Sequence, residues 1–288
     1  MNYALSIAMK VTYSIGELVP YINWLYFYHA WGVSRQTEAE QQQLRQEAEE
    51  RLQRYDRCYH VHALFGLFPA HSEGDDIVVE PRGERIPLLR QQQEGSEHLC
   101  LADFIVPLHS PLTTHHSPLT THPSPNTQIS LFATSVDIGM ETDFDADPFE
   151  KMMAQLVADR LAEAAAEVMH RDVRTRYWGY APDEQLSISD LHAERFQGIR
   201  PAVGYPSLPD VSLNFVIDRL LGGMSQIGIR LTESGAMKPH ASVSGLMISH
   251  PQAHYFSIGK IGEDQLRDYA RRRGLPVETM RRFLSANL

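Results

Sequence analysis

The sequence of 288 residues is 43% hydrophobic and 22% charged, and it carries a formal net charge of −10. A chain of this length and composition can bury a sizeable core, which excludes global disorder, and its acidic excess excludes the basic surface that nucleic-acid binding requires. The two cysteines, Cys58 and Cys100, lie far apart and outside any CxxC pattern, which excludes a disulfide framework and a cysteine-based zinc site and favours a cytoplasmic location.

The N-terminal part is predicted to be helical and not to enter a membrane. Residues 1–9 lack the basic start of a signal peptide. The apolar stretch 18–33 is too short to span a bilayer and is interrupted by polar residues and Pro20. The pattern therefore predicts a largely buried helix over 15–31 and a solvated amphipathic helix over 36–55.

Short strands are predicted to follow these helices. The runs 63–68 and 77–79 are rich in apolar residues, and the polar run 71–76 between them is typical of a turn. Residues 85–89 are expected to extend this meander.

Residues 109–122 consist of the heptapeptide HSPLTTH written twice, followed by Pro-Ser-Pro. Four histidines so close together suggest one hypothesis, a zinc or nickel site, because neutral imidazole is a common ligand of both ions. The other hypothesis is tandem copying without function, because a Pro/Thr/Ser segment offers no scaffold that would fix the ligand geometry. We therefore predict a dispensable low-complexity loop over 109–125 and no metal site. The four histidines are His109, His115, His116 and His122.

The second half of the chain is predicted to mix helices and strands. A long helix is expected over 148–174, because apolar residues recur there at helical spacing. Because helices and strands follow no regular alternation, we predict an α+β fold with an antiparallel sheet. The stripe of the long helix that should be buried comprises Met153, Val157, Leu161, Ala164 and Val168. The shorter helices are expected at 209–221, 263–273 and 276–285, and the strands at 227–231, 241–248 and 255–258.

Familiar catalytic motifs are missing from the sequence, which contains no Walker A loop, GxSxG elbow, HExxH or GxGxxG. The nearest approach is Val-Asp-Ile-Gly-Met-Glu at 136–141, which has the strand and glycine of a Rossmann-type methyltransferase but not the further glycines. We interpret it as the end of an ordinary strand.

Two runs of unusual composition stand out. In 198–209, three prolines and two glycines predict an extended, exposed and pre-organised loop around one Arg and one Tyr. By itself this run would be interpreted as a surface connection between helices. Residues 232–245 and 249–256 form the second run, which is rich in small residues and aromatics.

Together these runs closely resemble the C-terminal reactivation domain of cobalamin-dependent methionine synthase, whose hallmarks include an RPAxGYP loop and an ASVSG…SHP…Y stretch. The resemblance implies one curved domain over 1–288, with a central twisted antiparallel sheet flanked by helices, and S-adenosylmethionine as its ligand. The repeated segment at 109–122 has no counterpart in the family. The resemblance also takes in 21–24, 66–70 with 74–77, 100–104, 158–164 and 177–182.

By this resemblance, Arg200 would grip the methionyl carboxylate of the ligand through a charge-assisted pair. The backbone around Ala202 and Gly204 would hydrogen-bond the adenine. Tyr255, with Phe256 beside it, would offer an aromatic face or a hydroxyl close to the nucleoside and the sulfonium. Without the resemblance, an aromatic pair packed in the core is an equal alternative for these two residues.

Two acids and one tyrosine complete the implied site. Glu163 and Glu194 match family acids near the ligand, although each would otherwise be interpreted as a solvated carboxylate. Tyr205 matches a family tyrosine at the cobalamin face, and it is the candidate catalytic residue that reaches the cofactor.

The sequence departs from the family pattern at three positions. Asn23 stands where the family has an Asp that faces the ligand's ammonium, so the contact loses its charge assistance and affinity should be lower. Leu208 and Val211 replace a Cys and a His that follow the GYP loop, which weakens the expected contacts to the cobalamin-binding partner.

In the family, cob(II)alamin is reduced by a flavodoxin-like electron donor and then takes the methyl group of S-adenosylmethionine. The resemblance therefore implies a methyltransferase component that supports this re-methylation in a partner methionine synthase. The sequence contains no cobalamin-binding DxHxxG motif, so we expect a separate subunit or an excised piece that is not complete alone. One alternative is an S-adenosylmethionine-binding module without a redox role. A self-sufficient methyltransferase is weaker, because nothing resembles a general base beside an acceptor pocket.

Overall fold

The computed structural model describes residues 8–95, 97–108 and 127–288. The low-complexity loop predicted over 109–125, with its duplicated heptapeptide and its four histidines, lies outside the described residues. The hypotheses about that loop therefore stay predictions.

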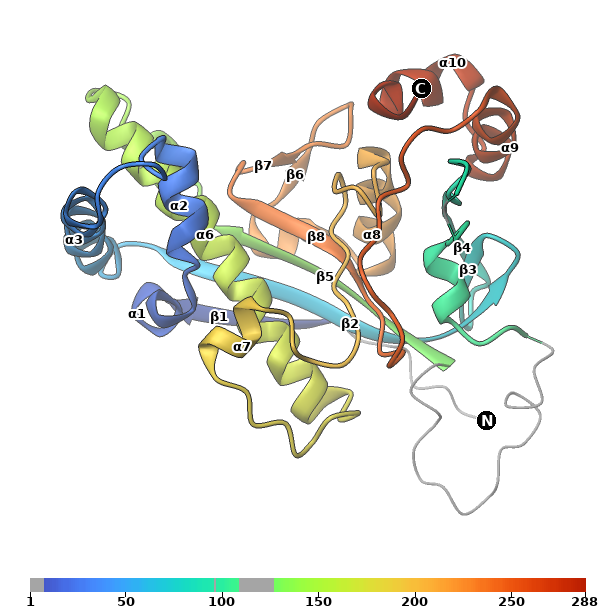
Figure 1. Ribbon diagram of the computed structural model, residues 1–288, viewed down its shortest axis with the longest axis horizontal. Helices are drawn as coiled ribbons and strands as arrows, with labels where there is room; N and C mark the ends of the chain where they lie inside the picture. Colours follow the sequence, from blue (N-terminus) through green and yellow to red (C-terminus); the bar gives the residue numbers. More distant parts are fainter. Residues whose placement is uncertain (1–7, 96, 109–126) are drawn as a thin grey trace.

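A curled antiparallel sheet forms the centre of the described chain (Figure 1). Its longest strand, β2, pairs with β5 along one side. Along its other side, β2 pairs first with β1 and then with β3. The strand order is therefore β4-β3-β2-β5-β8, with β1 beside β2. The strands are β1 (Met9–Ser14), β2 (His60–Glu73), β3 (Asp76–Val79), β4 (Glu84–Pro87), β5 (Gln128–Val136) and β8 (Ser242–Met247), with β6 (Arg230–Leu231) and β7 (Met237–Lys238) in a separate two-stranded sheet.

Helices cover both faces of the sheet and its far end. In Figure 1, α6 crosses the sheet, α1 to α3 lie at one end, and α9 and α10 lie at the other. The α-helices are α1 (Ile15–Leu18), α2 (Trp24–Trp31), α3 (Glu38–Tyr55), α5 (Gly139–Thr142), α6 (Pro148–Asp172), α7 (Ile188–His192), α8 (Asn214–Leu220), α9 (Glu263–Arg273) and α10 (Val277–Phe283). The shorter turns are η1 (Val19–Tyr21), η2 (Leu101–Phe104), η5 (Val211–Leu213), η6 (Met224–Ile227) and η7 (Ser285–Asn287), together with the π-helical η4 (Val173–Tyr177).

The central strands are buried on both faces. Successive side chains of a strand point to opposite sides of the sheet, and each side here packs into a core of its own. Ala63 and Phe65 of β2 pack into a core with α6 and α1 to α3, whereas Leu64 between them packs into a second core with α8. This double burial explains why 63–68 is a continuous apolar run without alternation. A third, smaller core joins α9 and α10 to the rest of the chain.

The long helix α6 forms largely as predicted. The Asp147 side chain caps it by accepting hydrogen bonds from the Phe149 and Glu150 amides, and Pro148 occupies its first turn. All five residues of the predicted apolar stripe are buried. At Val173 the α-helical pattern gives way to the π-helical η4, which the spacing did not predict.

The single helix predicted over 15–31 is wrong. The chain forms α1, then the 3-10 turn η1 at Pro20, and starts α2 only after Asn23. Proline lacks the amide hydrogen that a continuous helix needs, and Asn23 caps a new helix with its side chain.

Several strand predictions also need correction. The polar run 71–76 is not all turn, because β2 continues to Glu73 and the turn is formed by Gly74 and Asp75. Residues 255–258 form no strand; instead the Ile258 amide donates to the Pro206 carbonyl at 2.9 Å. Of 227–231, only Arg230–Leu231 are in a strand.

Of two further strands, β1 was not predicted, and β5 was predicted only at its end, where Val136 closes the strand as interpreted for 136–141. β5 contains Ser130, Thr134 and Ser135, which interrupt its apolar pattern. All three are buried, and the Thr134 hydroxyl donates to the Ala162 carbonyl of α6 at 3.0 Å. Tertiary hydrogen bonds thus satisfy Thr134 and Ser135 in this central strand, whereas Ser130 Oγ has no partner among the described residues.

Candidate functional site

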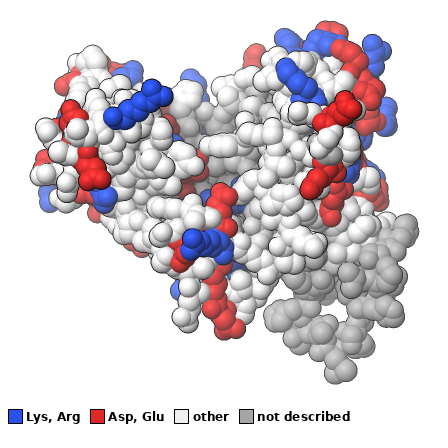
Figure 2. All heavy atoms as spheres, viewed as in Figure 1, with Lys and Arg blue, Asp and Glu red and all other residues white. Residues whose placement is uncertain are grey.

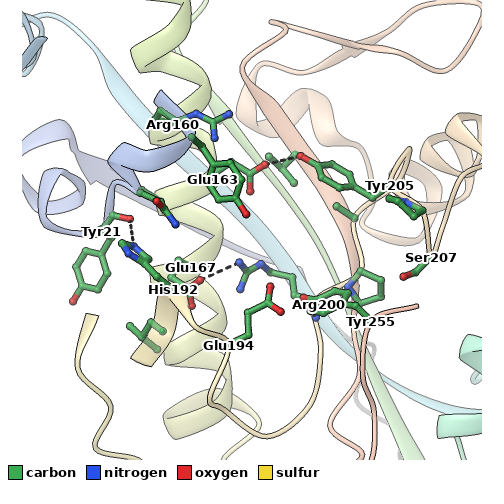
Figure 3. Close-up of a pocket in the computed structure, with 18 of the residues that line it drawn as sticks. Tyr21, Arg160, Glu163, Glu167, His192, Glu194, Arg200, Tyr205, Ser207 and Tyr255 are labelled. Atoms are coloured by element: carbon green, nitrogen blue, oxygen red, sulfur yellow. Dashed lines mark hydrogen bonds and ion pairs between the residues drawn. The ribbon is translucent and has the colours of Figure 1, made fainter. Parts of the chain in front are cut away.

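A cleft of about 590 Å³ lies between α6 and the loop that follows α7. In the space-filling view this face is hollowed at its centre (Figure 2), and Figure 3 shows the side chains that line the hollow. Eight of the nine predicted site residues line this cleft: Asn23, Glu163, Glu194, Arg200, Ala202, Tyr205, Tyr255 and Phe256. Gly204 is the exception; its amide donates to the Leu208 carbonyl at 2.8 Å, and its φ of +88° serves the turn.

The loop that carries Arg200 is fixed to the edge of the sheet. Ile199 exchanges backbone hydrogen bonds with Ile248, the residue after β8, and the pairing continues along β8 through Pro201 and Val203. Because alternate residues of an antiparallel ladder face its two sides, the amide of Ala202 points away from β8. The attachment needs glycine in β8, since a Cβ on Gly245 would lie 2.2 Å from the Pro201 carbonyl oxygen.

One face of α6 and its π-helical extension forms a polar stripe toward this loop. Its members are Glu163, Glu167, His170 and Arg174, which are spaced by four, three and four residues and so lie on one side of a helix. Each of them contacts the chain between Glu184 and Tyr205. We call these four residues the polar stripe.

Arg200 lines the cleft, and two members of the polar stripe hold its side chain. Its guanidinium donates from Nη2 to Glu167 Oε2 at 3.1 Å (Figure 3). It also donates from Nη1 to His170 Nδ1 at 3.0 Å. Although burial opposes its charge, the Glu167 carboxylate raises the pKa of Arg200. The side chain remains 14% exposed, at the floor of the cleft.

His170 is fully buried and neutral. An arginine can only donate, so Nδ1 of His170 accepts and the ring proton sits on Nε2. Burial, reinforced by the charges of Arg174 and Arg200, holds the pKa of His170 well below its usual range. Neither His170 Nε2 nor Glu167 Oε1 has a hydrogen-bond partner among the described residues.

Tyr205 bridges the mouth of the cleft. Its hydroxyl donates to Glu163 Oε1 at 3.0 Å, and the residue is 53% exposed. The negative charge of Glu163, together with burial, raises the pKa of Tyr205 to about 12. The phenol is therefore protonated and presented outward near neutral pH.

Tyr255 and Phe256 form the wall opposite α6. The Tyr255 hydroxyl accepts a hydrogen bond from the Arg200 amide at 2.9 Å, so it supports the loop and leaves part of the ring facing the cleft. Burial raises the pKa of Tyr255. Phe256 is partly buried, and its backbone is bonded to the Ser207 side chain. Tyr255 thus borders the cleft, whereas Phe256 also packs against the core.

Asn23 and Glu194 lie on the remaining sides of the cleft. Asn23 Oδ1 accepts from the Leu25 amide at 3.2 Å, so the amide that was expected to face the ligand also caps α2. Glu194 adopts a φ of +55°, which is uncommon for a residue with a Cβ. Desolvation raises the pKa of Glu194 although the residue is exposed overall.

The sequence analysis missed several residues that line the cleft, and also His170, which contacts Arg200 without lining the cleft. Glu167 and His170 lie on the polar stripe at helical spacing from Glu163, which is a signal that could have found them. Arg160, Tyr21 and His192 also line the cleft, and the His192 ring is bonded to the Tyr21 carbonyl at 3.0 Å. No local pattern predicted these contacts, because Tyr21 and His192 are 171 residues apart.

The effect that the departures at Leu208 and Val211 are expected to have on contacts to a cobalamin-binding partner stays a prediction. Leu208 is buried in the core, so its side chain does not contribute to the surface, and Val211 is partly buried. Among the described residues, no group of three or more His, Cys, Asp or Glu side chains could hold a metal ion. No helix of the described residues is long and apolar enough to cross a membrane.

Comparison with known proteins places these features in a family. A family model described as vitamin B12 dependent methionine synthase, activation domain, matches residues 14–274. Among solved structures, a crystal structure of the MetH reactivation domain bound to AdoHcy matches with a TM-score of 0.87 and 36% sequence identity. That match covers 98% of this chain and 90% of the other.

Proposed function

Because this chain belongs to the family of vitamin B12 dependent methionine synthase activation domains, we propose that its cleft binds S-adenosylmethionine for the reductive re-methylation of cob(II)alamin. The matching solved structure is bound to AdoHcy, S-adenosylhomocysteine, which is what remains of S-adenosylmethionine after methyl transfer. The chain is accordingly a component of a methyltransferase.

The observation that carries this proposal is the convergence of distant residues on one cleft. Glu163 in α6, Arg200 in the loop along β8 and Tyr255 in the C-terminal segment all line it. They are the residues that the family resemblance assigns to the ligand. The cleft volume of about 590 Å³ lies within the range of roughly 300–1,000 Å³ that is typical of small-molecule sites.

The charges of the cleft suit those of S-adenosylmethionine. The ligand carries one carboxylate, one ammonium and one sulfonium, so two of its three charges are positive. The cleft is lined by two guanidinium groups and three carboxylates, which supply one more negative than positive charge. These groups are Arg160, Arg200, Glu163, Glu167 and Glu194. The excess of carboxylates favours the cationic substrate over the neutral thioether product.

Each contact with the ligand has a candidate residue. Arg200 retains N–H groups beyond those that bond Glu167 and His170, and we assign it to the carboxylate. The backbone amide of Ala202, which points away from β8, is assigned to a hydrogen bond with the adenine. Tyr255 supplies an aromatic face, and Glu163 and Glu194 face the positive groups. Gly204 is left out, because its amide is already bonded.

The open side of the cleft suits transfer to a second domain. When present as cob(I)alamin on a partner, the corrinoid supplies a nucleophile that must approach in line with the bond from sulfur to methyl. Tyr205, at the exposed mouth of the cleft, is the residue assigned to meet it. The electron that reduces cob(II)alamin is assigned to a flavodoxin-like donor. The protein is assigned to the cytoplasm, in keeping with its two free cysteines.

Two measurements test this function. Calorimetry should show that the protein binds S-adenosylmethionine and S-adenosylhomocysteine with one site each. Mixed with a methionine synthase that lacks its own activation domain, cob(II)alamin and a one-electron reductant, the protein should restore methylcobalamin formation. Binding without restored methylation would favour the ligand-binding module, and absence of binding would refute the proposal.

A further inference from the structure

The polar stripe on α6 contains two residues that contact Arg200 from inside the protein. Glu167 is 7% exposed, His170 is fully buried, and both bond the guanidinium group at about 3 Å. The same guanidinium faces the cleft on its other side. The Arg200 guanidinium is therefore bonded on one side by Glu167 and His170 and faces the proposed ligand on the other.

The contacts from the interior restrict the guanidinium in two directions. The carboxylate of Glu167 bonds Nη2, and the imidazole of His170 bonds Nη1, so the two terminal nitrogens are held by separate side chains. Both side chains come from consecutive turns of a 25-residue helix packed on the sheet. Such a pair fixes the plane of the guanidinium as well as its position.

These two residues keep polar atoms without partners, at a cost in stability. Glu167 Oε1 and His170 Nε2 are shielded from solvent and lack hydrogen-bond partners among the described residues. Buried groups of this kind are expensive, and a fold that keeps two of them beside one arginine departs from the usual rule of complete pairing. Other buried atoms of the described residues also lack partners, among them Arg174 Nη1. What distinguishes Glu167 and His170 is that both bond the arginine that faces the cleft.

We propose that Glu167 and His170 are positioning residues, which orient the Arg200 guanidinium so that its remaining N–H groups meet the amino-acid carboxylate of the ligand. The inference rests on the proposed function, since it takes Arg200 as the carboxylate contact. Glu167 acts as a charged acceptor, and His170 acts as a neutral one. Glu167 also borders the cleft, but the unpaired atoms of both residues are shielded from solvent, so the two residues act through Arg200.

The proposal predicts a loss that depends on the chemistry of the ligand. S-adenosylhomocysteine and 5′-methylthioadenosine share the nucleoside and a neutral thioether, but only the first carries the amino-acid group. Replacing Glu167 by Gln keeps the shape and removes the charge, so affinity for S-adenosylhomocysteine should fall about tenfold, in line with the loss of a charged hydrogen bond. Affinity for 5′-methylthioadenosine should stay within about twofold.

His170 provides a second, independent variant if Glu167→Gln does not fold. His170→Leu removes the acceptor at Nδ1 and should weaken S-adenosylhomocysteine binding about fivefold, whereas His170→Asn places an amide oxygen near the same position and should restore most of it. In an Arg200→Ala background, neither the Glu167 nor the His170 substitution should change affinity by more than about twofold, because the coupling passes through Arg200.

Glu184→Gln is the matched control. Glu184 also pairs with a buried arginine of the polar stripe, Arg174, but neither residue lines the cleft. Its replacement should lower stability and leave the ratio of the two ligand affinities unchanged. Equal losses for both ligands in Glu167→Gln and His170→Leu would overturn the positioning role, as would an unchanged affinity for S-adenosylhomocysteine. Failure of the wild-type protein to bind S-adenosylhomocysteine would instead refute the proposed function.

Discussion

Two arginines meet at the polar stripe and are held in different ways: Arg174 belongs to the stripe, and Arg200 reaches it from the loop along β8. Arg174 is fully buried, bonds both oxygens of Glu184 at 2.8 and 2.7 Å, and stacks over the Phe196 ring at 4.1 Å. Arg200 meets only one oxygen of Glu167, completes its contacts with neutral His170, and stays 14% exposed to the cleft.

This difference shows how one helix can serve both stability and binding. Arg174, matched by a whole carboxylate, joins two segments of the fold. Its Nη1 group has no partner among the described residues, but the side chain is fully buried and so is closed to a ligand. A guanidinium held by one carboxylate oxygen and an imidazole is oriented but keeps donors for a carboxylate from outside. We call these the closed pair, Arg174 with Glu184, and the open pair, Arg200 with Glu167.

The largest effect is expected from breaking the closed pair. Glu184→Gln leaves the fully buried Arg174 without a charge partner, which typically costs about 3–5 kcal/mol. Urea unfolding of the two proteins would measure the difference in free energy of unfolding. A loss below about 1 kcal/mol would show that the closed pair does not stabilise the fold in the way that its geometry indicates.

Breaking the open pair should affect binding more selectively. Arg200→Ala should weaken S-adenosylmethionine binding by at least about 1.5 kcal/mol, the lower end for a hydrogen bond to a charged group. Because the substitution also leaves Glu167 unpaired, Arg200→Lys is the control that keeps the charge but not the planar fork. Calorimetry that shows unchanged affinity in a folded Arg200→Ala protein would contradict the assignment.

The neutral acceptor of the open pair predicts a dependence of stability on pH. Burial lowers the pKa of His170 in the folded protein, so the unfolded chain binds its proton first as the pH falls below the ordinary value of about 6.5. The stabilising effect of a neutral His170 is therefore present above that pH and is lost progressively below it. Unfolding free energies measured between pH 7 and pH 5 should fall more in the wild type than in His170→Asn; equal slopes would be the contrary result.

The smallest effect should come from a substitution of Asn23, which lies on another side of the cleft. Asn23→Asp keeps the cap of α2, since both side chains accept the Leu25 amide, and adds a carboxylate for the ligand's ammonium. S-adenosylmethionine binding should tighten by roughly 1 kcal/mol at low salt, and the gain should shrink as salt is added. Unchanged binding at low salt would indicate that Asn23 serves the helix cap alone.

The sequence predicted local features better than pairings across the fold. The bounds of α9 and the glycine that ends it at Gly274 were predicted correctly, because capping signals lie within a few residues of the helix they end. The Arg200 loop was likewise singled out by a local signal, the prolines and glycines within it. Its pairing with Glu167 was not predicted, because the two residues are 33 positions apart and only the packing of α6 on the sheet brings them together.

Strands were harder to predict than helices for a related reason. The central strand β5 includes polar residues whose partners lie in α6 and η6, so its burial cannot be inferred from its own pattern. The break before α2 was signalled by Pro20 and Asn23, but the aromatic run that follows obscured it. The hydrophobic pattern indicated the core correctly and the limits of its elements less well.

The backbone of the Arg200 loop also protects the sheet from other chains. β8 is the last strand in the order of the sheet, and such edges expose backbone groups that can pair with another molecule and seed aggregation. Ile199 to Val203 already occupy part of that edge with their own hydrogen bonds. Substitutions that detach this loop, such as those that place a side chain at Gly245, should therefore reduce solubility as well as ligand binding.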